Sequence, residues 1–156
     1  MRILIPSILA AVMILSAAPA AFAAHPVPFN GNGSGTFTMT PTGVSVTGTG
    51  HFEHLGLTTI SATGAITGVT TCGGFSATEQ DAYTAANGDA VTLQVSNVYC
   101  ATSGPNVFQV TGSFTVVGGT GRFADATGSG TISGTAVFLT PTSGTFSETT
   151  TGTISY

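Results

Sequence analysis

Apolar side chains alternate with Thr, Ser and Gln along much of the chain, and this two-residue period restricts the fold most strongly. In the segment 108–116, Phe108, Val110, Phe114 and Val116 share one parity, while Gln, Thr and Ser occupy the other. Because successive side chains of a β-strand point to opposite faces, this pattern predicts strands with one buried face. The same alternation recurs at 37–39, 44–46, 91–95 and 146–156. No sustained helical period follows residue 23, so the pattern predicts an all-β fold.

Turn sequences separate these strands at regular intervals. They are Pro41-Thr42-Gly43, Ala86-Asn87-Gly88-Asp89, Ser103-Gly104-Pro105-Asn106, Gly118-Gly119 and Pro141-Thr142-Ser143-Gly144. Asn-Gly is a strong hairpin signal because both residues tolerate positive φ. We therefore predict an antiparallel barrel of about eight strands, with a β-sandwich as the alternative. Closure is favoured because open Thr-rich edges without lysine invite edge-to-edge pairing.

One segment departs from the strand pattern. Glu79, Gln80 and two alanines cluster in 77–86, which predicts a single helical turn there. Glu79 and Asp81 are the only close pair of carboxylates in the chain, and this interpretation places both of them in a loop.

The N-terminal segment has the features of an export signal. Arg2 precedes an apolar run over 3–15, and Ala21-Phe22-Ala23 matches a small-residue cleavage site. We predict a signal peptide at 1–23 and a single β-barrel domain at 24–156, secreted or periplasmic. No later run is apolar and long enough to predict a transmembrane helix.

Charge excludes two classes of partner. The chain has six acids and two bases, and Arg2 lies in the predicted signal peptide, so the mature chain has a net charge of −5. Arg122 is then its only Lys or Arg side chain. Nucleic acids and anionic membrane surfaces both require clusters of cationic side chains, and we predict neither as a partner.

The only two cysteines, Cys72 and Cys100, predict a disulfide in an oxidising compartment, with two free thiols as the alternative. The segments that contain the two cysteines flank Tyr83 and Asn87-Gly88, so we expect the disulfide to hold the least regular part of the barrel. Closing a loop of this length contributes about 3–4 kcal/mol in a loop-entropy treatment.

A glycine-rich turn follows the strand that ends near Val116. Gly119-x-Gly121-x-x-Ala124 matches a dinucleotide-binding turn, but that function requires a helix next, and residues 127–134 have strand and turn chemistry. We therefore predict no cofactor. Gly118, Gly119 and Gly121 are assigned a structural role as turn residues with positive φ. Phe123 is expected to close one end of the core, and Arg122 is expected to pair with Asp125.

Histidine chemistry is sparse. His51, Glu53 and His54 form the only cluster, and a third or fourth metal ligand is not evident, so we predict no metal site. The chain has no Gly-x-Ser-x-Gly element and no spacing that ties a nucleophile to a base. The sequence assigns no catalytic residue and predicts no hydrolytic or redox activity.

Three segments carry a resemblance to a known group of proteins. They are 50–56, where Phe52-Glu53 departs from the usual Ala-Thr, 85–89 and 117–128. The chain resembles small secreted bacterial proteins related to the allene oxide cyclase and dirigent barrels. The resemblance implies an eight-stranded antiparallel barrel, often oligomeric, with an apolar lumen. Plant members of that superfamily guide or perform cyclisation and coupling of small hydrophobic molecules, but no residue-level match to their pocket acids is visible.

The leading hypothesis is a secreted barrel without evident catalytic machinery that binds a small apolar ligand, with Glu53, His54 and Arg122 as candidate polar contacts. One alternative is a cyclase-like or dirigent-like enzyme acting on a small hydrophobic substrate. Others are a structural extracellular surface protein and a small outer-membrane barrel. A lumen with a cavity and convergent polar groups favours binding or catalysis, whereas a lumen filled by Phe and Val favours a structural role.

Overall fold

Nine strands and one short 3₁₀ helix make up the residues that the computed structural model describes, 25–156. The predicted signal peptide lies outside the described residues. The elements are β1 (Val27–Pro28), β2 (Gly31–Met39), β3 (Gly43–Phe52), β4 (Gly56–Val69), β5 (Phe75–Ala85), β6 (Ala90–Ala101), β7 (Val107–Gly119), η1 (Gly121–Phe123), β8 (Thr127–Thr140) and β9 (Ser143–Ser155).

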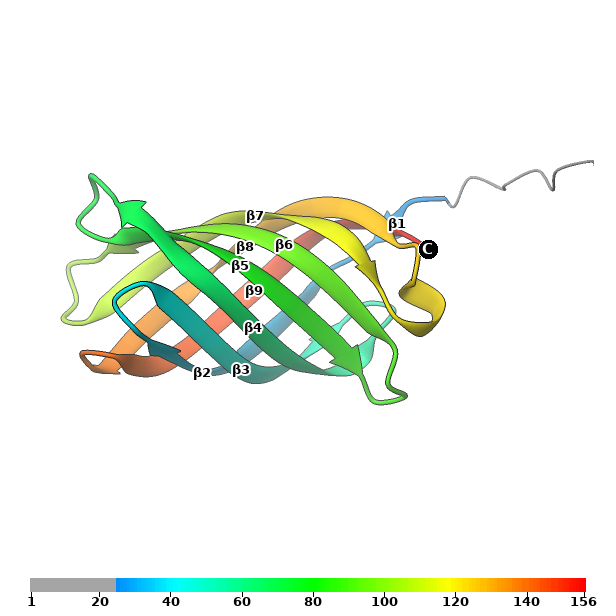
Figure 1. Ribbon diagram of the computed structural model, residues 1–156, viewed down its shortest axis with the longest axis horizontal. Helices are drawn as coiled ribbons and strands as arrows, with labels where there is room; N and C mark the ends of the chain where they lie inside the picture. Colours follow the sequence, from blue (N-terminus) through cyan, green and yellow to red (C-terminus); the bar gives the residue numbers. More distant parts are fainter. Residues whose placement is uncertain (1–24) are drawn as a thin grey trace, which may run out of the picture.

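The strands close into a barrel. From β2 to β9 each strand pairs antiparallel with the next, and β9 also pairs with β2, which closes the sheet (Figure 1). β1 pairs antiparallel with the end of β9, with Val27 opposite Ile154. It lies on the same side of β9 as β2 does. The predicted antiparallel eight-stranded barrel is confirmed, and the sandwich alternative is wrong.

The two ends of the barrel differ. The hairpin connections β2–β3, β4–β5, β6–β7 and β8–β9 lie at one end, on the left in Figure 1, and η1 and the C-terminus lie at the other. The second end is filled by aromatic side chains that are all almost fully buried: Phe29, Phe52, Tyr83, Phe114 and Phe123. We call these two ends the open end and the closed end.

Inward-facing glycines make room for large side chains from neighbouring strands. A Cβ at Gly130 would lie 2.6 Å from the ring of Phe114, and a Cβ at Gly64 would lie 2.6 Å from Cγ of Glu79. A Cβ at either glycine would also press on a backbone oxygen of a neighbouring strand, so any larger residue must displace that backbone as well as the side chain beside it. The many glycines of the chain therefore shape the lumen as well as the turns.

Hydroxyl side chains cover the outer surface. Along β9 the outward, exposed positions are Thr145, Ser147, Thr149, Thr151 and Thr153, and β2 and β3 continue the pattern. No helix within residues 25–156 has the length and apolar character needed to cross a membrane.

The helical turn predicted near 77–86 is wrong. The segment is strand β5, which pairs with β4 and β6 along its length. Five of its inward positions are buried: Ala77, Glu79, Asp81, Tyr83 and Ala85. Because two of the five are acids, the alternation of burial is not an alternation of hydrophobicity. Glu79 and Asp81 therefore lie inside the barrel and not in a loop.

The disulfide between Cys72 and Cys100 is confirmed, with a Cα–Cα distance of 5.2 Å. It joins the β4–β5 connection to the end of β6 at the open end. The expectation that it holds the region of Tyr83 and Asn87-Gly88 is wrong, because Tyr83 lies inside strand β5 and Asn87-Gly88 forms a tight hairpin turn at the closed end, with Gly88 at φ 90°.

Candidate functional site

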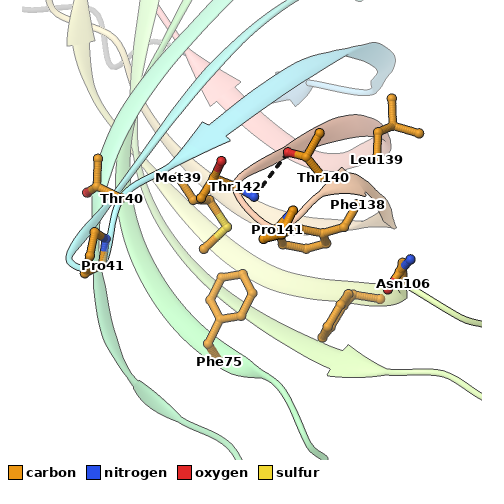
Figure 2. A pocket seen from close by; sticks show the side chains of 11 residues that line it. Met39, Thr40, Pro41, Phe75, Asn106, Phe138, Leu139, Thr140, Pro141 and Thr142 are labelled. Carbon is orange, nitrogen blue, oxygen red and sulfur yellow. Dashed lines mark hydrogen bonds between the residues drawn. The ribbon is translucent and has the colours of Figure 1, made fainter.

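A wide apolar pocket occupies the open end of the barrel (Figure 2). Its volume is about 720 Å³. Its lining comes from the ends of β2, β5, β7 and β8 and from the adjoining turns: Met39, Thr40, Pro41, Phe75, Asn106, Phe108, Phe138, Leu139, Thr140, Pro141 and Thr142. We call this the mouth pocket. Its volume lies within the range of known small-molecule sites.

An aromatic collar narrows the barrel beneath the mouth pocket. Phe75 stacks on Tyr99 with ring centroids 4.3 Å apart, and Phe138 meets Phe37 edge-on at 4.8 Å. The space inside the collar is only about 10 Å³. Phe75 and Phe138 line both the mouth pocket and the collar, so the two adjoin.

A small polar cavity lies below the collar, in the middle of the lumen. Its volume is about 40 Å³, and Tyr99 and Ala136 line both it and the collar. Three carboxyl groups reach it: Glu79 and Asp81 from β5, and Glu148 from β9 on the opposite side of the barrel. Half of the acids in the chain therefore converge on this lumen cavity.

Hydrogen bonds fix two of the three carboxyl groups. Tyr99 donates its hydroxyl to Glu79 Oε1 at 2.9 Å, and Asn97 donates its Nδ2 to the same oxygen at 3.2 Å. Tyr83 donates its hydroxyl across the barrel to Glu148 Oε1 at 2.9 Å. Each donor is thus aimed at a carboxylate, which rigidifies the lumen.

Burial raises the pKa of all three acids, because the charged form loses its water. Burial, followed by repulsion from Glu79 and Glu148, raises the pKa of Asp81 to about 8. Burial also raises the pKa of Glu79 and of Glu148, but the hydrogen bonds that they accept from tyrosine oppose the shift. At Asp81 no hydrogen bond from the described residues opposes the rise in pKa, so burial and repulsion both favour its neutral form.

Some oxygens in the lumen have no partner. Asp81 Oδ1 and Asn97 Oδ1 are buried and make no hydrogen bond with the described part of the chain. A buried polar atom left without a partner costs about 1–3 kcal/mol, so such atoms point to a group that completes the site. Thr150 Oγ1, a hydroxyl that can donate or accept, is also buried without a partner among residues 25–156, while the donors Tyr83 and Tyr99 are already engaged.

The candidate contacts taken from the sequence lie elsewhere. Glu53 is exposed in the β3–β4 turn and accepts hydrogen bonds from Asn30. Arg122 donates to the backbone carbonyl of His54 and lies over the rings of Phe123 and Tyr156. The structure brings His54 and Arg122 together, but at the closed end and away from the mouth pocket and the lumen cavity.

The glycine-rich turn after β7 forms η1. Gly118 and Gly121 adopt positive φ, and Gly119 does not. The ion pair of Arg122 is with Asp89, at 3.7 Å, so the expected pairing with Asp125 is wrong. Asp89 comes from the β5–β6 hairpin, which is folded against η1, while Asp125 is exposed. Across residues 25–156, no group of three or more His, Cys, Asp or Glu side chains is placed to hold a metal ion.

None of the three lumen acids was predicted to face the lumen, because the direction of each side chain depends on the strand that carries it. A parity count from Tyr83, with Asp81 and Glu79 two and four residues before it, places all three on one face. Glu148 shares parity with the predicted inward residues Phe146 and Ile154. That parity is a signal for Glu148 that the sequence did contain.

Comparison with known proteins adds one structural likeness. No protein-family model matches the sequence, and a search of curated proteins gives no match. The chain is similar to the solved structure of the pterocarpan synthase dirigent protein GePTS1, at 13% sequence identity over 87% of this chain and 88% of that chain, with a TM-score of 0.49. The barrel rests on the strand pairing described above. A relation to allene oxide cyclases and a bacterial source stay predictions.

Proposed function

We propose that this protein is a secreted barrel that binds a small, largely apolar molecule in the mouth pocket. The observation that carries the proposal is the pocket itself, about 720 Å³ of space lined by aromatic and aliphatic side chains at the open end. The closed end is plugged by packed rings, so the barrel offers a ligand one entrance. The disulfide supports export, because such bonds persist in oxidising compartments.

Nile red, an uncharged apolar dye, tests this proposal. We expect its fluorescence to rise when it binds the protein, with saturation at a single site. Leu139→Ser should weaken binding several-fold because it removes apolar surface from the rim of the pocket. The matched control is Leu57→Ser at the closed end, since both leucines are 69% exposed and neither substitution opens the core.

Two results would contradict the proposal. One is the absence of saturable dye binding to the natively folded protein. The other is an equal loss of binding in Leu139→Ser and Leu57→Ser, which would place the dye on the outer surface and not in the mouth pocket.

A second candidate function is acid–base catalysis on a bound ketone or enol, which corresponds to the cyclase-like alternative. The observation that favours it is the enclosed set of Glu79, Asp81 and Glu148, with raised pKa values beneath an apolar pocket. A neutral carboxyl can donate a proton to a carbonyl oxygen while an ionised neighbour removes a proton from the adjacent carbon.

Deuterium exchange into 2-octanone in D₂O, followed by NMR, measures this chemistry directly. Catalysed exchange should occur next to the carbonyl and should fall by about a hundredfold or more in Asp81→Asn, in line with the usual contribution of a general acid. Exchange at the buffer rate with the native protein would remove this candidate and leave ligand binding unaffected.

A further inference from the structure

The lumen contains more hydrogen-bond acceptors than free hydrogen-bond donors. Six carboxyl oxygens and Asn97 Oδ1 surround or adjoin the lumen cavity, and its donors, Tyr83, Tyr99 and the Asn97 amide, already serve Glu148 or Glu79. Asp81 Oδ1 and Asn97 Oδ1 lack partners, on side chains that are 95% and 93% buried. A ligand that completes this cavity while Asp81 is ionised must therefore supply hydrogen-bond donors.

The distribution of charged side chains also favours a ligand that donates hydrogen bonds to the lumen acids. Arg122 is the only Lys or Arg among residues 25–156, and it lies at the closed end, while His25, His51 and His54 are all exposed. The three lumen acids thus have no cationic side chain near them. Buried charges in proteins are normally paired, and residues 25–156 supply no cationic partner in the lumen.

The volumes of the lumen cavity, the collar and the mouth pocket restrict the shape of the ligand. The lumen cavity of about 40 Å³ holds a group of a few heavy atoms, because a water-sized probe needs roughly 10–15 Å³. The collar has about 10 Å³ of free space, room for at most one water, so an alkyl chain passes it only if the rings of Phe75 and Phe138 move apart, and the mouth pocket accepts a bulky apolar body. A small head, a narrow neck and an apolar body follow from this sequence of spaces.

We propose that the ligand is a primary amine with an apolar body, whose ammonium group enters the lumen cavity between Asp81, Glu79 and Glu148 while its body fills the mouth pocket. This inference rests on the proposed function and names the chemical class of its ligand. An ammonium has three donors and no acceptor, which matches the unpartnered oxygens. The lumen cavity is then the part of the site that selects the head group.

The pH dependence of binding separates this ligand from its rivals. The titratable groups that face Asp81 are Glu79 and Tyr83 on its own strand, Tyr99 on β6 and Glu148 on β9, and the remaining strands contribute no acid or base to the lumen cavity. An ammonium binds best when Asp81 is ionised, so amine binding should displace a proton. A ketone accepts a hydrogen bond and binds best when Asp81 is neutral.

A series with one tail and four heads provides the test: n-octylamine, 1-octanol, 2-octanone and octanoate, titrated calorimetrically at pH 6, 7 and 8. We expect n-octylamine to bind about tenfold or more tightly than 1-octanol at pH 8, a margin typical of a hydrogen-bonded charge pair. Its affinity should rise between pH 6 and 8, by up to about tenfold per unit where one proton is displaced. Octanoate should bind most weakly.

Variants assign the effect to the lumen. Asp81→Asn should lower n-octylamine affinity about tenfold and leave 1-octanol binding within about twofold, since it removes one charge and keeps the shape. Glu148→Gln provides a second variant in the same cavity. Asp125→Asn is the matched control, because it removes one exposed carboxylate at the closed end and should leave n-octylamine affinity unchanged.

The outcomes distinguish a failure of the amine assignment from a failure of the proposed apolar binding. If the alcohol and ketone bind as tightly as the amine, the head-group assignment is overturned and apolar binding stands. An amine preference that survives Asp81→Asn and Glu148→Gln also overturns it, as does competition by Ca²⁺, which would assign the cavity to a metal ion. If neither the series nor Nile red binds, the proposed function itself is wrong.

Discussion

At the residue scale, the most consequential position is Asp81. Its strand places it inward, in a sheet whose neighbouring lumen positions include Ile60, Ala62 and Val110. An acid at such a position is rarely selected for stability, because burying its charge is unfavourable unless the charge is paired. The sequence showed the residue but not its surroundings, since Glu148 approaches it from 67 positions further along the chain.

Asp81 should make stability depend on pH. Its pKa is raised from 3.8 to about 8 in the folded state, so between pH 4 and 8 the folded chain holds a proton that the unfolded chain has released. The free energy of unfolding should therefore fall as pH rises through this window, by up to about 1.4 kcal/mol per unit, and level off above pH 8. Urea denaturation at several pH values measures the slope.

The Asp81→Asn variant is the control for that slope. It should flatten the pH dependence and be more stable than the native chain at pH 8, although Glu79 and Glu148 leave a remaining slope of the same sign. A variant that is less stable than the native chain at pH 8, with an unchanged slope, would show that the carboxyl is already ionised and well paired in the folded protein.

At the element scale, η1 shows how a turn closes a barrel. The glycine-rich segment that resembled a nucleotide-binding turn forms three residues of 3₁₀ helix, and its one buried side chain is Phe123. That side chain lies 4.7 Å, between ring centroids, from Tyr156 and joins the main core cluster. The turn chemistry was predictable from Gly118 and Gly121, whereas the pairing of Arg122 with Asp89 depends on a distant hairpin.

Phe123→Ala should lower the free energy of unfolding by about 3–5 kcal/mol, because it leaves a cavity where a ring was fully buried. Arg122→Ala should cost under about 1 kcal/mol, since its ion pair with Asp89 is half-exposed and screened by solvent. Chemical denaturation of the two variants side by side gives the comparison. Equal losses would show that the closed end is held by the charged cluster and not by the ring.

At the scale of the whole molecule, the fold was predictable and the site was not. Strands and hairpins follow from local patterns such as 108–116 and Asn87-Gly88, and barrel closure follows from the need to satisfy the edges. The lumen cavity arises only when β5 and β9 face each other across the closed sheet, and the mouth pocket arises from the ends of four strands and three connections. Strand parity places Glu79, Asp81 and Glu148 on inward faces, but no local pattern shows that these faces meet, which is why the sequence drew attention to Glu53, His54 and Arg122.

Strand β1 also fixes the orientation in which this barrel can be presented. Val27 pairs with Ile154, so the start of the described chain and its last residues lie together at the end opposite the mouth pocket (Figure 1). A tether attached to either terminus would hold the protein with its entrance facing outward. The barrel can therefore be immobilised on a solid support or fused to another domain while its opening stays accessible to molecules arriving from solution.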